Sequence, residues 1–306
     1  QQATHLASVG KLFTATLVGI LYEKGKLTYE DKIQKHLDED LMRGLHLYKG
    51  KDYSGEITIK HLLRQTSGLN DVFMPLLKKM IDDPKLEFSV REALEWGKNN
   101  LKPIAKPGKK HFYTDTNYHL LGLIIESITG KPFQVAIHDM IFEPLKMNHA
   151  YIQGYSKPKV DPLYPPANIY LNHANLIENK RIAKIDYAGG GVVAPLSEFL
   201  LFMKALVNGH LVKKTTLDRM INDDVTMGFP ALGFDYGYSM WKPKVIPLLM
   251  PKKYFCWGCV GSTGAFMFFH PLTETYIIGT FNDDSYTSKA LRFMLKKVIR
   301  PLLKLS

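Results

Sequence analysis

The chain has 306 residues, enough for one large domain or two small ones, and its 45% apolar residues are sufficient for a substantial core. The formal net charge is +11, but the basic residues are scattered in singles and pairs and form no aromatic-interleaved stripe. This pattern favours a solvated basic surface over a nucleic-acid groove. No apolar run approaches the roughly eighteen residues of a membrane span, and no signal-peptide pattern opens the chain, so the compartment stays open.

The first predicted element is a helix over residues 7–24, which Gly25 ends. Its apolar residues recur at helical spacing and predict burial of one side: Leu12, Phe13, Leu17, Ile20 and Leu21. A second helix is expected over residues 57–63, with Thr58 as a possible N-cap. A long polar helical stretch follows.

The middle of the chain combines helices with a long irregular segment. Residues 118–129 predict an apolar helix closed by Gly130. Residues 154–180 are rich in Pro, Tyr and Asn and show little periodicity, which indicates a surface loop or a lid. The glycines at 189–191 precede another expected helix, residues 197–207.

The last third of the chain reads as an antiparallel meander followed by a helix. The expected strands are residues 233–241, 252–260, 264–270 and 274–282, and the helix covers residues 288–303. We therefore expect an α+β fold in which an antiparallel sheet flanked by helices lies beside an α-rich lobe.

The expected domain boundaries follow from this distribution of helices and strands. One α/β lobe is formed by residues 1–24 and 190–306, and a helical lobe by residues 25–189, which includes the loop that begins at Tyr113. No internal repeat or low-complexity tract is present.

The two cysteines, Cys256 and Cys259, are too few for a disulfide framework. No second Cys-x-x-Cys is present to complete a zinc site. Because residues three apart on a strand point to opposite faces, we interpret the pair as two small strand residues.

Three Ser-x-x-Lys tetrads occur in the chain, and their context distinguishes them. The tetrad Ser156–Lys159 contains a proline in the irregular segment, and the tetrad Ser239–Lys242 lies in an expected strand, where the two side chains point apart. Only the tetrad Ser8–Lys11 opens a buried helix, on which residues three apart share a face.

This spacing brings the Lys11 amine within reach of the Ser8 hydroxyl at a helix N-terminus, which favours developing negative charge. A serine becomes a nucleophile only when a base takes its proton, and a lysine does so when burial or positive charge lowers its pKa. Alone, the tetrad is better explained by an N-cap serine and a surface lysine.

Further motifs accompany the tetrad in a fixed order along almost the whole chain. They are the segments 7–14, 57–69, 106–118, 188–191 and 258–264. Together they resemble serine β-lactamases of class C and the related penicillin-binding proteins, D-amino peptidases and esterases. The resemblance implies a β-lactamase/transpeptidase-like fold and catalysis through an acyl-serine intermediate.

Residue by residue, the resemblance implies that Ser8 is acylated, that Lys11 assists, and that Tyr113 of a Tyr-x-Asn motif shares the base role. A buried lysine and tyrosine can share one proton and titrate as a pair. The third position of that motif is Asp115, which we expect to hydrogen-bond Lys11 or a substrate amide.

The third motif of the family corresponds to Cys259, Val260, Gly261 and Ser262. The resemblance implies that Gly261 lets the backbone approach the substrate and that the N–H groups of Ser8 and Ser262 form an oxyanion hole. Cys259 replaces a Lys or His that contacts a substrate carboxylate or passes a proton. This change favours ester or uncharged amide substrates over penicillins.

The family normally has several tens of residues before its Ser-x-x-Lys, including the first strands of the sheet, whereas this chain has only residues 1–6. We therefore expect the N-terminal strands to be absent from this chain, an incomplete N-terminus, and an exposed edge on the remaining sheet.

The leading hypothesis is a serine hydrolase acting on a small-molecule, peptide or ester substrate. The alternatives are a D-amino-acid peptidase or carboxypeptidase acting on cell-wall peptides, and a non-catalytic sensor or binding protein on the same scaffold. No metal or organic cofactor is implied, because no HExxH, P-loop or GxGxxG motif is present. The oligomeric state cannot be read from the sequence.

Overall fold

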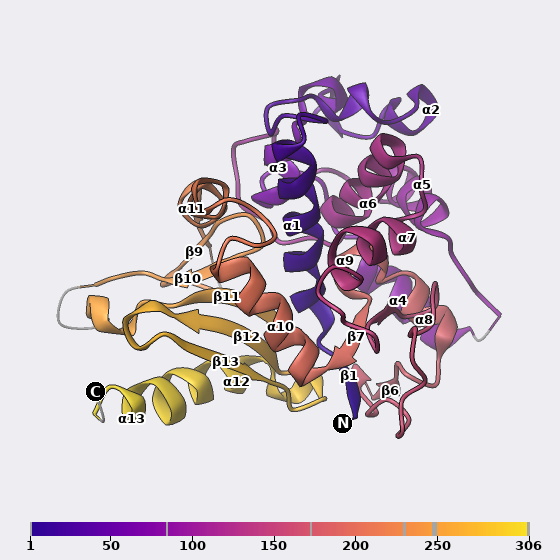
Figure 1. Ribbon diagram of the computed structural model, residues 1–306. Helices are drawn as coiled ribbons and strands as arrows, with labels where there is room; N and C mark the ends of the chain where they lie inside the picture. Colours follow the sequence, from indigo (N-terminus) through magenta and orange to yellow (C-terminus); the bar gives the residue numbers. More distant parts are fainter. Residues whose placement is uncertain (1, 84, 172, 229–230, 247–249, 305–306) are drawn as a thin grey trace.

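The computed structural model describes residues 2–83, 85–171, 173–228, 231–246 and 250–304 (Figure 1). The fold is of the α+β class, as the sequence predicted, with a six-stranded antiparallel sheet beside a large helical region.

The large sheet has the strand order β13-β12-β11-β10-β9-β8, and all neighbours are antiparallel. Its strands are β8 (Val225–Thr226), β9 (Phe234–Tyr236), β10 (Trp241–Pro243), β11 (Trp257–Gly261), β12 (Ala265–His270) and β13 (Thr275–Gly279). Among the described residues, β8 and β13 form its two edges.

Two of the expected strands differ from the structure. The expected strand 233–241 is divided into β9 and β10, because Ser239 has a φ of 62° and turns the chain. The expected strand 252–260 begins with a 3-10 turn, Lys252–Tyr254, and becomes extended strand only at Trp257.

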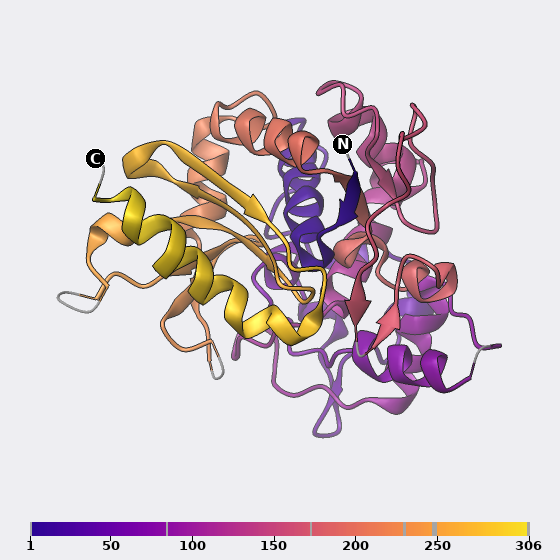
Figure 2. The ribbon, with the colours of Figure 1, turned by 90° about the horizontal axis from the view of Figure 1, so that it is seen from below.

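Alternate residues of β12 point to opposite faces of the sheet, and each face has its own core. Phe266 and Phe268 pack against α12 (Thr287–Phe293), which continues through a π-helical segment, Met294–Ile299, into α13 (Arg300–Leu302). Met267 and Phe269 join the main core, which also contains residues of α1 (Gly10–Glu23) and α10 (Leu196–Val207). Figure 2 shows the C-terminal helix lying along the sheet.

The two cysteines face different cores, as predicted, although only Cys259 is a strand residue and Cys256 precedes β11 by one residue. Cys256 belongs to the core beneath α12, and Cys259 belongs to the main core. Both are buried free thiols.

The N-terminal residues form a strand of a second, smaller sheet. In it, β1 (Ala3–His5) pairs with β7 (Val192–Pro195), which also pairs with β4 (Tyr151–Ile152). Because β4 comes from the segment expected in the helical lobe, the smaller sheet contains strands from both expected lobes. The division into two lobes stays a prediction.

The helical region surrounds α1, which lies at the centre of the molecule in Figure 1. Its helices are α2 (Glu39–Met42), α3 (Ile59–Leu63), α4 (Phe73–Asp82), α5 (Val90–Asn100), α6 (Thr116–Thr129), α7 (Phe133–Ile137), α8 (Lys180–Lys184) and α9 (Tyr187–Gly190), and α11 (Lys214–Asn222) follows α10. Two hairpins complete it, β2 (Leu47–Tyr48) with β3 (Lys51–Asp52) and β5 (Tyr170–Leu171) with β6 (Ala174–Asn175).

Local signals account for several helix ends. The Thr58 side chain caps α3, with His61 completing a capping box, and Gly130 ends α6 in the left-handed conformation. Helix α11 was not predicted, and the segment 154–180 contains the β5-β6 hairpin. Within the described residues no single helix has the length and apolar character of a membrane span, and α6 with the segment Phe133–Phe142 passes that test only as a pair bent by 76°.

Candidate active site

The start of α1 positions Ser8 and Lys11. A 3-10 turn, Ala7–Val9, leads directly into the helix, and Ala7 has a left-handed φ of 48°. The His5 ring fixes this turn, because its Nδ1 accepts a hydrogen bond of 3.0 Å from the Ala7 amide. A non-glycine residue held in this conformation beside a nucleophile is backbone strain of the kind found at functional sites.

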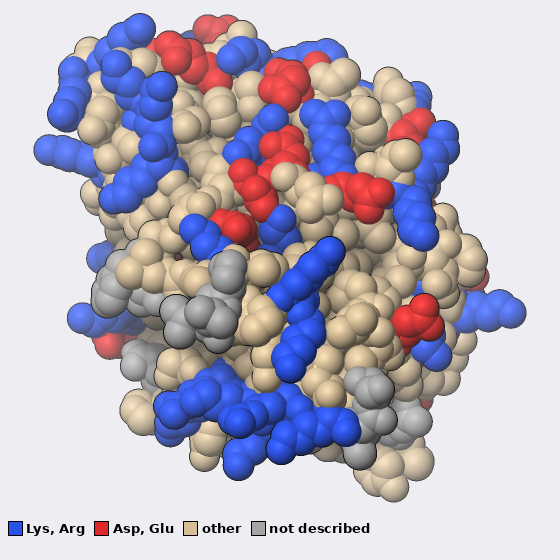
Figure 3. Space-filling model, turned by 90° about the vertical axis from the view of Figure 1, so that its left-hand side faces the viewer, with Lys and Arg blue, Asp and Glu red and all other residues tan. Residues whose placement is uncertain are grey.

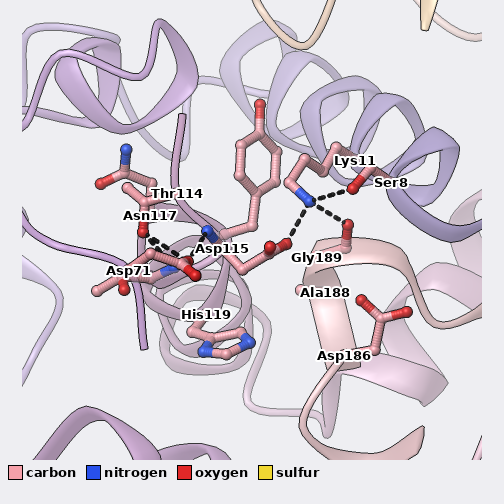
Figure 4. Close-up of polar contacts among 12 residues, drawn as sticks. Ser8, Lys11, Asp71, Thr114, Asp115, Asn117, His119, Asp186, Ala188 and Gly189 are labelled. Atoms are coloured by element: carbon pink, nitrogen blue, oxygen red, sulfur yellow. Dashed lines mark hydrogen bonds and ion pairs between the residues drawn. The ribbon is translucent and has the colours of Figure 1, made fainter. Parts of the chain in front are cut away.

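The Lys11 amine lies 3.0 Å from the Ser8 hydroxyl oxygen. It also donates to a carboxylate oxygen of Asp115 and, at 2.7 Å, to the carbonyl of Gly189 (Figure 4). The Lys11 side chain is completely buried, so these three acceptors replace the water that an exposed ammonium would bind.

The other two tetrads have different partners. The Ser156 hydroxyl accepts from the amide of Ile152, while Lys159 pairs with Glu143. Ser239 donates to the carbonyl of Lys11, and Lys242 pairs with Asp224. Only the first tetrad therefore brings its serine and lysine into contact.

Electrostatics around Lys11 differ from the sequence-based expectation of a lowered pKa. Burial does lower the pKa of Lys11, but the negative charges of Asp115 and Asp186 outweigh burial and raise it above its ordinary value. Lys11 is therefore an ammonium in the resting site. The pKa of Asp115 is itself raised to about 7, first by burial and then by the neighbouring carboxylates of Asp71 and Asp186, against the lowering effect of Lys11.

Tyr113 stands close to this pair. Its ring centroid lies 5.0 Å from the Lys11 amine, and its hydroxyl is buried without a hydrogen-bond partner among the described residues. Burial raises the pKa of Tyr113 well above its ordinary value, despite the lowering effect of Lys11. The tyrosine is therefore a neutral phenol in the resting site.

A hollow of about 310 Å³, here called the Ser8 hollow, opens beside the nucleophile. Its reactive wall contains Ser8, Tyr113, Asp115 and Ser262. The remaining wall is partly apolar and partly acidic, and it is formed by His5, Ala7, Asp71, Phe73, Met74, Phe112, Leu171, Leu176 and Asp186.

Several residues of this wall were missed by sequence reasoning. The Asp186 carboxylate lies 3.0 Å from Nε2 of His5, so it holds the ring that fixes Ala7. Asp71 accepts from the Asp115 amide at 2.8 Å and thereby orients the end of the Tyr-x-Asp loop. Neither carboxylate belongs to a sequence motif that indicates a role in the site. Only tertiary packing brings Asp71 and Asp186 close to Ser8.

The residues of the third motif lie on different sides of the site. Ser262 lines the Ser8 hollow, whereas the buried Cys259 thiol donates to the carbonyl of Ser8 at 3.2 Å from behind it. Gly261 was expected to let the backbone approach substrate, which stays a prediction, and the structure shows a packing role for it as well. A Cβ at Gly261 would lie 2.2 Å from the Leu6 carbonyl, so this glycine lets β11 approach the segment before Ser8.

The comparison with protein families agrees with this geometry. The family model described as beta-lactamase matches residues 1–298, nearly the entire chain. The chain belongs to the beta-lactamase family. Its curated relatives include penicillin-binding proteins, which is the group that the sequence predicted.

One curated member of this group is penicillin-binding protein 4* of Bacillus subtilis (strain 168). It is 30% identical over 222 residues, which cover 69% of this chain and 46% of the relative. The putative penicillin-binding protein PbpX of the same strain is 26% identical over 224 residues, 71% of this chain and 49% of the relative. The chain thus spans under half the length of these relatives.

Solved structures confirm the beta-lactamase fold. D-amino acid amidase from Ochrobactrum anthropi SV3 matches with a TM-score of 0.78 and 20% identity, covering 99% of this chain and 86% of that chain. EstCE1, a hydrolase with promiscuous acyltransferase activity, matches with a TM-score of 0.76 and 16% identity, covering 98% and 85%. At these identities the likeness shows the fold alone.

Proposed function

We propose that the protein is a serine hydrolase that cleaves ester or amide substrates through an acyl-serine intermediate on Ser8, with an esterase-like preference over β-lactam hydrolysis. The observation that carries the proposal is the contact of the Ser8 hydroxyl with the buried Lys11 amine at the wall of the Ser8 hollow. An exposed N-cap serine beside a surface lysine would not place a fully buried amine there.

The proton of Ser8 needs an acceptor, and the resting ammonium of Lys11 is not one. Asp115 contacts the same amine, and its pKa of about 7 suits it to accept a proton at neutral pH. We therefore assign a relay in which Lys11 passes a proton to Asp115 and takes the proton of Ser8 as its oxygen attacks the substrate carbonyl. We assign Tyr113, whose ring centroid lies 5.0 Å from the Lys11 amine, as the group that donates a proton to the leaving group, and the proton taken up by Asp115 then returns through Lys11 to Tyr113.

The oxyanion that forms in this attack requires nearby N–H donors. Ser8 and Ser262 both line the hollow, which supports their backbone N–H groups as the oxyanion hole. The carbonyl groups of both residues point to other partners, since Ser8 accepts from Cys259 and Ser262 accepts from Thr287.

The charges of the hollow favour substrates without a carboxylate. Asp71, Asp115 and Asp186 contribute acidic groups to its wall, and they would repel the carboxylate of a penicillin. Burial raises the pKa of the Cys259 thiol to about 12, so this residue supplies no charge at neutral pH.

The same acidic wall favours a second candidate, the hydrolysis of amides that carry a free amine. An ammonium group would gain from Asp71 and Asp186, and the apolar side chains Phe73 and Phe112 suit a hydrophobic acyl group. The structural likeness to a D-amino acid amidase makes amino acid amides the substrates to try first.

The test is labelling with a fluorophosphonate probe, followed by peptide mapping, with turnover of p-nitrophenyl acetate, D- and L-phenylalanine amide and nitrocefin measured in parallel. Ser8→Ala should abolish labelling and turnover, and the matched control Ser156→Ala should retain both. Label on Ser8 with ester turnover and little nitrocefin cleavage supports the proposal. If amide turnover exceeds ester turnover, the second candidate is favoured. If Ser8 stays unlabelled in folded protein, its assignment as the nucleophile is wrong.

A further inference from the structure

Tertiary structure gathers basic residues that are scattered in the sequence. The segments 242–254 and 285–304 contain ten Lys and Arg residues and no Asp or Glu, in a chain whose net charge is +11. Figure 3 shows a band of basic side chains along the lower part of one face, where the C-terminal helix runs, with no acidic side chain inside it. The upper part of the same face mixes both signs.

The C-terminal helix has a buried side and a charged side. Ala290, Met294 and Ile299 are buried against the sheet. On the outer side four basic residues are exposed, and none forms an ion pair with a described acidic residue: Arg292, Lys296, Lys297 and Arg300. Like charges this close together on one side of a helix repel one another, so the row concentrates positive charge where a mixture of signs would be more stable.

Apolar surface is exposed beside this row. A hollow of about 480 Å³ lies between the helix and the chain near Met250. Its apolar wall includes Tyr254, Leu291 and Leu295, and its basic wall includes Arg292, Lys296 and Arg300. Next to this hollow, Ile246 pairs with Met250. The side chains of Val245 and Ile246 are 49% and 39% exposed. Exposed apolar side chains bordered by cations are a combination found on surfaces that lie in a membrane interface.

We propose that this surface, formed by Val245, Ile246, Arg292, Lys296, Lys297 and Arg300 and here called the basic face, docks the protein on an anionic lipid bilayer. The cations meet lipid phosphates, while the apolar side chains enter the boundary between headgroups and acyl chains. This is peripheral binding and requires no membrane-spanning helix.

The apolar part of the surface favours a bilayer over a soluble acidic polymer. A polyanion would pair with the cations alone, and its binding would be lost completely in high salt. A bilayer also receives Val245 and Ile246, so part of the affinity should persist when the charges are screened.

The experiment is co-sedimentation of the whole protein with vesicles of phosphatidylglycerol and phosphatidylcholine, in equal parts, against vesicles of phosphatidylcholine alone. The charge variant is Lys296→Glu, Lys297→Glu, Arg300→Glu. Its matched control reverses three exposed lysines that lie elsewhere and form no ion pair with a described residue: Lys26→Glu, Lys102→Glu, Lys109→Glu. Ester turnover of both variants checks that they fold.

We expect the wild type and the control to bind the anionic vesicles, and the charge variant to bind at least about tenfold more weakly. We expect Val245→Ser with Ile246→Ser to lose the binding that remains in 0.5 M salt. Equal binding of the two triple variants to anionic vesicles overturns the proposal. The proposal is also overturned, in favour of an acidic polymer, if the protein binds dextran sulfate as tightly as the anionic vesicles and the double serine variant weakens neither interaction.

Discussion

Asp115 differs chemically from the amide that the Tyr-x-Asn motif would place there, and the difference changes the charge of the site. Its carboxylate contacts the Lys11 amine, and both side chains are buried. A neutral amide would remove the largest charge that raises the pKa of Lys11, so the pKa would fall, with burial lowering it and Asp186 still raising it. The residue at position 115 therefore decides which group accepts the serine proton.

We expect kcat/KM for p-nitrophenyl acetate to rise with pH through a limb near pH 7 in the wild type, because Asp115 must be ionised to accept a proton. In Asp115→Asn this limb should vanish, since the titrating group is gone and the pKa of Lys11 falls. pH–rate profiles of the two proteins check this. An unchanged limb near pH 7 in the variant would remove Asp115 from the relay.

Cys259 supports the nucleophile from behind, because its thiol donates to the Ser8 carbonyl in the main core. Cys259→Ala should lower the free energy of unfolding by about 1–2 kcal/mol through the lost contact and the small cavity. Cys259→Ser, which keeps a donor, should lose less. Denaturant unfolding measures both, and the preference for ester over nitrocefin should be retained because neither change adds a charge.

At the scale of elements, the site depends on how closely α9 approaches α1 and the Tyr-x-Asp loop. A Cβ on Gly10 would lie 2.8 Å from the Gly190 Cα, so α1 and α9 touch through their backbones. A Cβ on Gly189 would lie 2.6 Å from a carboxylate oxygen of Asp115 and 3.6 Å from the Lys11 amine. The glycine run thus leaves room for the Lys11–Asp115 contact.

Gly189→Ala should therefore push Asp115 away from Lys11 and reduce ester turnover by about 10²-fold, the usual effect of a displacement near 1 Å at a reacting group. Gly228→Ala is the control, because a Cβ there meets no atom of a described residue within 4 Å. Turnover and unfolding are measured for both variants. Activity of Gly189→Ala near that of the control would show that the pair tolerates the added methyl group.

At the scale of the whole molecule, burial of several histidines links stability to pH. The pKa values of His61, His111 and His119 are each lowered to about 4, mainly by burial, from an ordinary value of 6.5. Between pH 6.5 and 4 the unfolded chain therefore binds more protons than the folded protein, and acidification destabilises the fold. Asp115, whose pKa is raised, opposes this trend in part.

We expect the free energy of unfolding to fall as the pH is lowered from 6.5 to 4. His119→Gln should make the fall less steep by up to about 1.4 kcal/mol per pH unit, since one titrating group is removed. Denaturant titrations across this range provide the measurement. A slope identical to that of the wild type would mean that His119 is not kept neutral by burial.

The sequence by itself determined the family, the fold class and the tetrad that opens α1, because periodicity, caps and motif order are local properties of the chain. It also indicated that Cys256 and Cys259 face opposite cores, since strand alternation is local as well. The break between β9 and β10 was missed, because a single left-handed residue, Ser239, decides it.

Only the tertiary structure decided the electrostatics of the site and the position of the basic face. The pKa of Lys11 depends on Asp115 and Asp186, which are more than a hundred residues away in the sequence and reach it only through packing. The basic charges appeared scattered along the chain, and the fold places the segments near Met250 and Arg292 on either side of one hollow. Charge and burial act through space, so their effects follow from the folded arrangement of residues that the sequence keeps apart.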